Sequence, residues 1–181
     1  MRWRLIAVTG GLIVVTALIV SVFIPFAWIE PREPHGFQSA GKPTIEFPEL
    51  TGPVVDDAHL LSEADERELT ASLKALEDKN TDQVVVVTVP SLQGHSIEEY
   101  GNRLGRYWGV FTAEKSNGAL LLVAPNEHKV RIEIGRGLEG ILPNNVSQEI
   151  IDKSILPHFR TGDYAAGIKD GVNALLLVLA S

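Results

Sequence analysis

The chain lacks cysteine and has no excess of positive charge. Without cysteine it has no disulfide framework, no zinc–thiolate site and no thiol nucleophile. Lys and Arg number 16 against 23 Asp and Glu, a formal net charge of −7. Because neutralising phosphates needs clustered Lys and Arg, we do not expect nucleic-acid binding through a generally basic surface. The composition also excludes a collagen-like or wholly disordered chain.

Charged residues are missing from the segment Leu5–Ile29 as well. Its 25 residues would form a helix of about 37 Å, longer than the roughly 30 Å hydrocarbon core of a bilayer. Arg2 and Arg4 precede this segment, which predicts that the N-terminus lies inside the cell. We therefore predict a signal anchor over residues 1–29 in the cytoplasmic membrane, with the rest of the chain in the periplasm or outside the cell.

A cleaved secretory signal is the alternative to an anchor. Such a signal has a shorter apolar stretch of about 7–15 residues, followed by a small-x-small cleavage site. Here the segment ends in Phe26-Ala27-Trp28-Ile29, which does not fit that site. The sequence favours the uncleaved anchor.

The rest of the chain is acidic and divides into two parts. Residues 30–181 carry 14 basic and 23 acidic residues, a net charge of −9. Residues 30–50 contain four prolines and show no apolar periodicity, which predicts a tether. Residues 51–181 are long enough for one domain with a hydrophobic core.

Hydrophobic periodicity predicts alternating helices and strands in this domain. Helices are expected from a capping residue, Ser62, to about Lys79, and from a second capping residue, Ser96. The apolar run 82–89 is typical of a strand buried on both faces, and 119–124 with 129–134 predicts an antiparallel hairpin. Two more helices are expected over 145–156 and 163–179, the latter capped by Asp163. This order predicts an α/β fold, a three-layer α/β/α sandwich with a mixed sheet, preceded by one transmembrane helix.

Three loop segments are rich in glycine, acids and amides, and we expect them to meet at the strand ends. They are 52–58, 115–118 and 135–140. The glycines of the third segment lack the spacing of a phosphate-binding loop. We expect them to provide positive φ angles and close backbone packing instead.

Four segments together resemble the TPM domain family. The first runs from Gly52 through Asp56-Asp57-Ala58 to Ser62, and the second is Asn117-Gly118 with the apolar strand that follows. The third is Gly135-Arg136-Gly137-Leu138-Glu139-Gly140, and the fourth is Phe159-Arg160-Thr161-Gly162-Asp163-Tyr164. The resemblance implies a three-layer sandwich, a divalent-cation site that often takes calcium, phosphatase activity, and work near membrane protein complexes.

The resemblance implies that Asp56, Asn117 and Glu139 are ligands of Ca²⁺ or Mg²⁺. Ser116 stands where the family usually has Asp, and a lost carboxylate weakens the binding of a hard cation. For a phosphatase, the candidate catalytic residues are Asp56, Asp57 and Arg136, with Arg136 as a clamp for an anion. The structural alternative is that Asp56 binds backbone amides, that Asn117 and Gly118 form a turn, and that Arg136 is solvated.

We thus predict a membrane-anchored domain outside the cytoplasm that acts as a binding or accessory module at a membrane protein complex or the cell envelope. Its expected partners are the membrane, through Leu5–Ile29, and a membrane protein. The alternatives are a weak metal-dependent acid phosphatase and a domain that has kept the fold but lost the ion.

Overall fold

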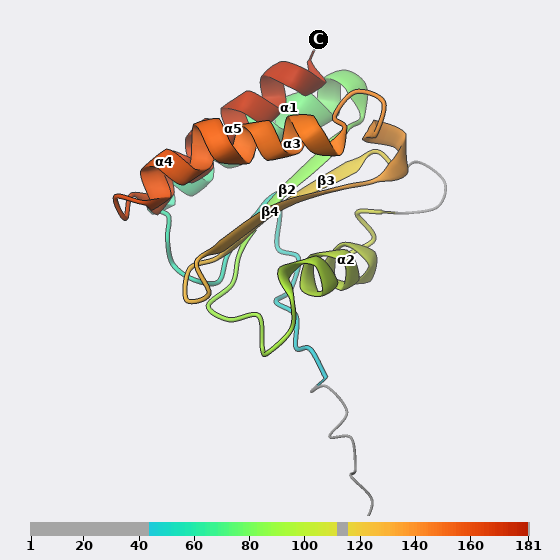
Figure 1. Cartoon of the computed structure of the whole chain (residues 1–181). Helices are drawn as coiled ribbons and strands as arrows, with labels where there is room; N and C mark the ends of the chain where they lie inside the picture. The colour runs from blue at the N-terminus through green and yellow to red at the C-terminus, as the bar shows by residue number, and fades with distance from the viewer. Residues whose placement is uncertain (1–43, 112–115, 181) are drawn as a thin grey trace, which may run out of the picture. The chain divides into compact units, whose positions relative to one another are not determined.

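The computed structural model describes residues 44–111 and 116–180. They form an α/β unit with a mixed four-stranded sheet between helices (Figure 1). In chain order the elements are β1 (Val54–Asp56), α1 (Glu63–Asn80), β2 (Gln83–Thr88), α2 (Ile97–Tyr107), β3 (Gly118–Ala124), β4 (Lys129–Ile134), the short helix η1 (Arg136–Leu138), α3 (Asn144–Ile150), the π-turn η2 (Ile151–Ile155), α4 (Leu156–Phe159) and α5 (Tyr164–Leu179).

The predicted anchor Leu5–Ile29 and residues 30–43 of the predicted tether lie outside the described residues. Among the helices of the described part, none is long and apolar enough to cross a bilayer.

The sheet has the strand order β1-β2-β3-β4. β1, β2 and β3 run parallel, and β4 runs antiparallel to β3, with Leu121 opposite Ile132. The predicted hairpin and the mixed sheet are therefore confirmed. The crossovers between the parallel strands are made by α1 and α2.

The prediction that 52–58 forms a loop is wrong, because Val54–Asp56 form the strand β1. Val54 and Val55 pair with Val86 and Val87 of β2, so that this segment is an edge strand. Three residues are too few to show the period-two alternation by which a strand is recognised in a sequence. The pairing partner, rather than the local pattern, makes this segment a strand.

Both faces of β2 and β3 are covered. Val84 and Val86 lie in one core cluster with Leu73 of α1, which α5 and η2 complete. Val85 and Val87 lie in a second cluster beneath α2, against Tyr100. Successive side chains of a strand point to opposite faces, so a strand buried on both sides needs an unbroken apolar run. This confirms the prediction for residues 82–89.

The packed part of the chain begins earlier than the predicted boundary at Thr51. Ile45 is buried, with 6 % exposure, in the cluster beneath α2. Phe47 lies edge-on to Tyr100 with ring centroids 5.3 Å apart, and the Trp108 indole N–H donates to the Pro48 carbonyl at 3.0 Å. Residues 44–50 thus pack with the domain.

The predicted helix over 145–156 is interrupted. The chain forms α3, widens into the π-turn η2, and resumes as α4, in which Pro157 occupies the first turn. Proline has no N–H to donate to a carbonyl four residues earlier, so a regular helix cannot pass through this position. A π-turn absorbs the mismatch and keeps Ile151 and Ile155 buried.

The predicted helix caps are present. The Ser62 hydroxyl accepts from the Asp65 N–H at 3.2 Å, and the Asp65 carboxylate accepts from the Ser62 N–H at 3.3 Å, a complete capping box. Ser96 accepts from the Glu99 N–H at the start of α2, and Asp163 accepts from the Ala166 N–H at the start of α5. Each side chain satisfies a backbone donor that has no partner within its helix.

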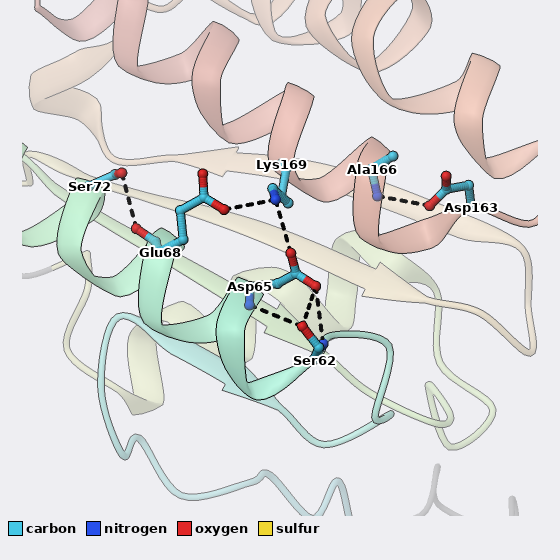
Figure 2. Close-up of polar contacts among 7 residues, drawn as sticks. All are labelled: Ser62, Asp65, Glu68, Ser72, Asp163, Ala166 and Lys169. Atoms are coloured by element: carbon cyan, nitrogen blue, oxygen red, sulfur yellow. Dashed lines mark hydrogen bonds and ion pairs between the residues drawn. The ribbon is translucent and has the colours of Figure 1, made fainter.

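Lys169 of α5 ties that helix to the first turns of α1 (Figure 2). Its ammonium group lies 2.9 Å from an Asp65 carboxylate oxygen and 2.8 Å from one of Glu68. The hydrogen bond from the Ser62 hydroxyl and then that from Lys169 lower the pKa of Asp65 from 3.8 to about 2. The bonds to Glu68 and Asp65 raise the pKa of Lys169.

This lowered pKa predicts an acid-dependent loss of stability. Because the pKa of Asp65 is lower in the folded state, its contribution is complete above about pH 4 and disappears as the pH falls towards about 2. In the 40–181 fragment, Asp65→Asn should lower the melting temperature at neutral pH, and the difference from wild type should shrink over that acid range. Glu63→Gln in the same helical turn is the control. An equal narrowing of the melting-temperature difference between this control variant and wild type at low pH would contradict the assignment.

Candidate functional site

The strand register separates the predicted site residues into two groups. Asp56 lies opposite Thr88 at the carboxyl end of β2, whereas Gly118, which follows Asn117, lies opposite Gln83 at its amino end. The six residues of β2 span about 17 Å at roughly 3.3 Å per residue. Asp56 and Asp57 are therefore at one end of the sheet, and Asn117 is at the other.

At the carboxyl end, the Asp56 carboxylate is bonded to the chain around it. One oxygen accepts from the Leu60 N–H at 3.1 Å and the other from the Leu61 N–H at 2.8 Å. The Thr88 hydroxyl also donates to Asp56, and it accepts from the Ala58 N–H at 3.0 Å. The carboxylate thus fixes the loop between β1 and α1, which is the structural alternative that the sequence left open.

Asp57 points away from this network and is exposed. It lines a pocket of about 330 Å³ together with Glu46, Ser91 and the buried Tyr100. Burial, then the negative charges of Asp57 and Glu127, raise the pKa of Tyr100 to about 12. The Tyr100 phenol is therefore a neutral group at physiological pH and does not supply a base.

Glu127 also lies at the carboxyl end of β2. One carboxylate oxygen accepts from the Ser91 hydroxyl at 3.1 Å and from the Leu92 N–H at 2.9 Å. These bonds join the hairpin turn between β3 and β4 to the loop that follows β2. Like Asp56, Glu127 uses its charge to hold a loop.

At the amino end, Asn117 comes directly before β3, and Gly118 begins that strand in a closely packed position. The Asn117 amide donates to the Thr81 carbonyl after α1, and the Asn117 carbonyl accepts from the Gln83 N–H at 3.0 Å. A Cβ on Gly118 would lie 2.1 Å from the Val110 carbonyl oxygen, and one on Gly135 would lie 2.2 Å from that of Ser116. Close packing is therefore confirmed at Gly135 but not at Gly140, where a Cβ would meet nothing within 4 Å. The expected positive φ is wrong for Gly135, with a φ of −72°, and also for Gly137 and Gly140.

Arg136 and Glu139 follow β4 at this same end and are exposed. Arg136 begins η1, which is held by a hydrogen bond of 2.9 Å from the Gly137 N–H to the Ser116 carbonyl. Arg136 is thus at the opposite end of the sheet from Asp56 and Asp57. The structure does not bring together the three predicted catalytic residues.

The predicted cation ligands do not form one donor set either. Asp56 is separated from Asn117 and Glu139 by the length of the sheet, and the Asn117 amide is turned to a backbone carbonyl. Within residues 44–111 and 116–180, no three His, Asp or Glu side chains gather in a way that could hold a metal ion. The residues present do not fit the implied cation as one site.

Thr88, at the carboxyl end of β2, is a polar residue that the sequence analysis did not identify. It is fully buried, and it is the only polar residue in the run Val84–Val89. A single polar residue in an apolar strand is a signal for a buried hydrogen bond, since a buried hydroxyl has to find hydrogen-bond partners. The role of Glu127 has no such local signal, because its partners lie more than 30 residues away.

The sequence matches the TPM domain family over residues 54–177. The chain belongs to this family. Its TPM domain is similar to the solution structure of the N-terminal domain of a protein from P. gingivalis, with 40 % identity and a TM-score of 0.68, over 71 % of this chain and 82 % of that one. The comparison with curated proteins found no match.

Two more distant structures share the fold. The N-terminal domain of the cg2496 protein from Corynebacterium glutamicum is 16 % identical, with a TM-score of 0.56 over 74 % of this chain and 84 % of that one. The BA42 protein from Bizionia argentinensis is 18 % identical, with a TM-score of 0.55 over 66 % and 81 %. Since two of these structures are isolated N-terminal domains, this fold forms without the remainder of those proteins.

Replacing Asp56 in the TPM domain should destabilise it. Asp56→Ala removes the acceptor of two backbone amides and of the Thr88 hydroxyl, and hydrogen bonds to a charged group are worth about 1.5–3 kcal/mol each. We expect urea unfolding of the 40–181 fragment to show a loss of about 2 kcal/mol or more. Asp57→Ala, at an exposed position, should stay within about 0.5 kcal/mol of wild type. Equal losses in the two variants would disprove the structural role of Asp56.

A second prediction concerns the close packing of Gly118 at the start of β3 in the TPM domain. Gly118→Ala forces a methyl group against the Val110 carbonyl and should reduce stability by about 1–3 kcal/mol. Gly140→Ala is the matched control, because a Cβ there meets nothing within 4 Å. The urea midpoints of the two variants measure this loss of stability. A Gly118→Ala midpoint equal to that of wild type would contradict the prediction.

Proposed function

We propose that this chain presents its TPM domain outside the cytoplasmic membrane, where the domain acts as a binding or accessory module at a membrane protein complex or the cell envelope. The observation that carries the proposal is the uncharged segment Leu5–Ile29 behind Arg2 and Arg4. A segment of 25 uncharged, mostly apolar residues inserts readily into a bilayer, and flanking arginines keep its start on the cytoplasmic side.

The distance between membrane and domain limits the choice of partner. Since Ile45 already packs into the domain, the linking segment is at most residues 30–43. Fourteen residues reach no more than about 50 Å even when fully extended, at about 3.3–3.6 Å per residue. A domain on so short a tether is held at a high effective concentration near other membrane proteins and envelope components.

The arrangement of the polar side chains favours binding over catalysis. Asp56 and Glu127 bond to backbone amides, and Arg136 is at the far end of the sheet from Asp57. A phosphatase needs its nucleophile and its cationic clamp around one phosphoryl group. Neither phosphatase activity nor cation dependence is therefore part of the proposal.

The anchor can be tested on the full-length chain with a C-terminal tag, expressed in a Gram-negative host. We expect it to stay in the membrane pellet after alkaline extraction and to be digested by protease added to spheroplasts. Ile13→Arg with Val14→Arg should abolish insertion, because each arginine costs about 2.5–3.5 kcal/mol at the centre of a membrane helix. Leu12→Ala with Leu18→Ala is the control and should remain in the membrane.

Two results would contradict the proposal. One is release of the wild-type chain by alkaline extraction, and the other is protection of the domain from external protease. For the accessory role, purification from detergent-solubilised membranes should recover a membrane protein with the wild-type chain but not with the arginine variant.

A further inference from the structure

β4 forms one edge of the sheet, and its outer side pairs with no strand of the described residues. The hydrogen bonds from Gly135 N to Gly118 O, at 2.8 Å, and from Gly137 N to Ser116 O, at 2.9 Å, fix which residues bond across this pair. Inward and outward pairs alternate along an antiparallel ladder. The N–H and C=O groups of Val130, Ile132 and Ile134 therefore point away from β3.

At its start, this edge is the floor of a groove; Ile132 further along is buried, with 5 % exposure, and neither Ile132 nor Ile134 lines the groove. Figure 1 shows β4 in front, with α3 and α4 on one side of the sheet and α2 on the other. A pocket of about 310 Å³ is lined by Ile97 and Glu98 of α2, by Lys129 and Val130 of β4, and by Ile151 of η2. The groove thus crosses the strand from one helical layer to the other.

The groove continues into a larger pocket of about 630 Å³ at the start of β4. The two pockets share His128, Lys129 and Leu156. The apolar wall of the larger one is formed by Leu156 with Phe159 and Tyr164, whose ring centroids are 4.8 Å apart. It has room for an apolar side chain and for a polar group beside it.

The charge of the larger pocket is opposite to that of the chain. Lys129 and Arg160 line it, both exposed, and of the described residues that line it none is acidic. The whole chain carries a net charge of −7. On the rim of the smaller pocket, Glu98 lies 3.7 Å from the Arg131 guanidinium. The local excess of positive charge therefore favours an anionic group in the larger pocket.

We propose that the β4 edge binds an extended acidic segment of a partner protein. The segment adds to the sheet as a fifth strand through the backbone groups of Val130, Ile132 and Ile134. An apolar side chain of the segment occupies the pocket beside Phe159 and Tyr164, and a carboxylate lies between Lys129 and Arg160. This inference names the partner chemistry for the binding role proposed above and rests on that role, but it does not depend on the membrane anchor.

A second copy of this chain fits the edge less well. Two-fold pairing of β4 about Ile132 would set Gly135 opposite Lys129 and leave the cationic pocket without a carboxylate. Pairing about Arg131 would set Glu133 opposite Lys129, but Glu133 already bonds to Arg131, and this register also sets two guanidinium groups opposite each other, which is unfavourable across a strand pair. A partner segment with its own acidic residues can pair with the outward backbone groups of β4 and also supply a carboxylate to the cationic pocket.

The test uses the 40–181 fragment, since isolated related domains fold. A phage-displayed library of random seven-residue peptides is selected on the wild-type fragment, with Lys129→Glu/Arg160→Glu as the counter-selection. We expect enriched peptides to combine Asp or Glu with β-branched or aromatic residues at alternate positions. A synthetic enriched peptide should bind the double variant at least about tenfold more weakly and should lose affinity as salt is raised. Lys74→Glu/Lys79→Glu on α1 has the same charge change and should bind as wild type does.

Backbone pairing is tested separately. Methylation of alternate peptide amides should abolish binding in one register and preserve it in the other, because only one set of amides faces β4. The amide signals of residues 129–134 should shift on binding. Val130→Pro removes an outward N–H without removing a bond to β3 and should weaken binding while the domain stays folded.

Several outcomes would overturn the proposal. They are selection of peptides without acidic residues, equal binding by the Lys129→Glu/Arg160→Glu variant, insensitivity to amide methylation, and signal shifts away from β4. Concentration-dependent dimerisation that perturbs residues 129–134 without peptide would identify a second copy as the occupant and also overturn it. Because the fragment lacks residues 1–39, these outcomes are independent of whether the full chain is anchored in a membrane.

Discussion

Burial of β2 and β3 on both faces is the constraint on which the rest of the domain depends. Val86 and Val87 point to opposite sides of the sheet, and both are fully buried. One helical layer therefore has to cover each face, which α1, α5 and η2 do on one side and α2 on the other. Leu121 and Leu122 repeat this arrangement in β3. With both faces covered, the sheet itself can meet other molecules only at its two ends and its edges.

Much of this architecture could be predicted from the sequence because its signals are local. The capping box at Ser62 and the cap at Asp163 depend on residues three positions away, and the hairpin depends on one short turn. The interruption inside the helix over 145–156 was not predicted, although Pro157 gives a local signal, since proline restricts a helix wherever it occurs. What could not be seen was the strand Val54–Asp56, because its signal is the pairing with β2 and not its own pattern.

That missing strand explains why the predicted site was assembled from residues that do not meet. Asp56 ends β1, whereas Asn117 precedes β3, and strands β1 to β3 are parallel. In a parallel sheet the residue that ends one strand and the residue that precedes another lie at opposite ends. Treating 52–58 as a loop removed this direction, so that nothing in the sequence opposed the grouping of Asp56 with Asn117 and Glu139 that the resemblance implied. The placement of these residues required the register.

An uncovered edge strand normally carries a device that prevents pairing with other chains, such as a charge, a bulge or a proline. β4 has charges, but Arg131 bonds to Glu133 on the same face and lies close to Glu98 of α2, so these groups are partly neutralised by one another. Val130, Ile132 and Ile134 are β-branched and favour an extended backbone. What limits access is the groove, because α2 and η2 rise on either side of the strand and admit a single extended chain more easily than another sheet. In the proposed interaction, the walls that keep another sheet away from the edge would also admit only a single extended segment.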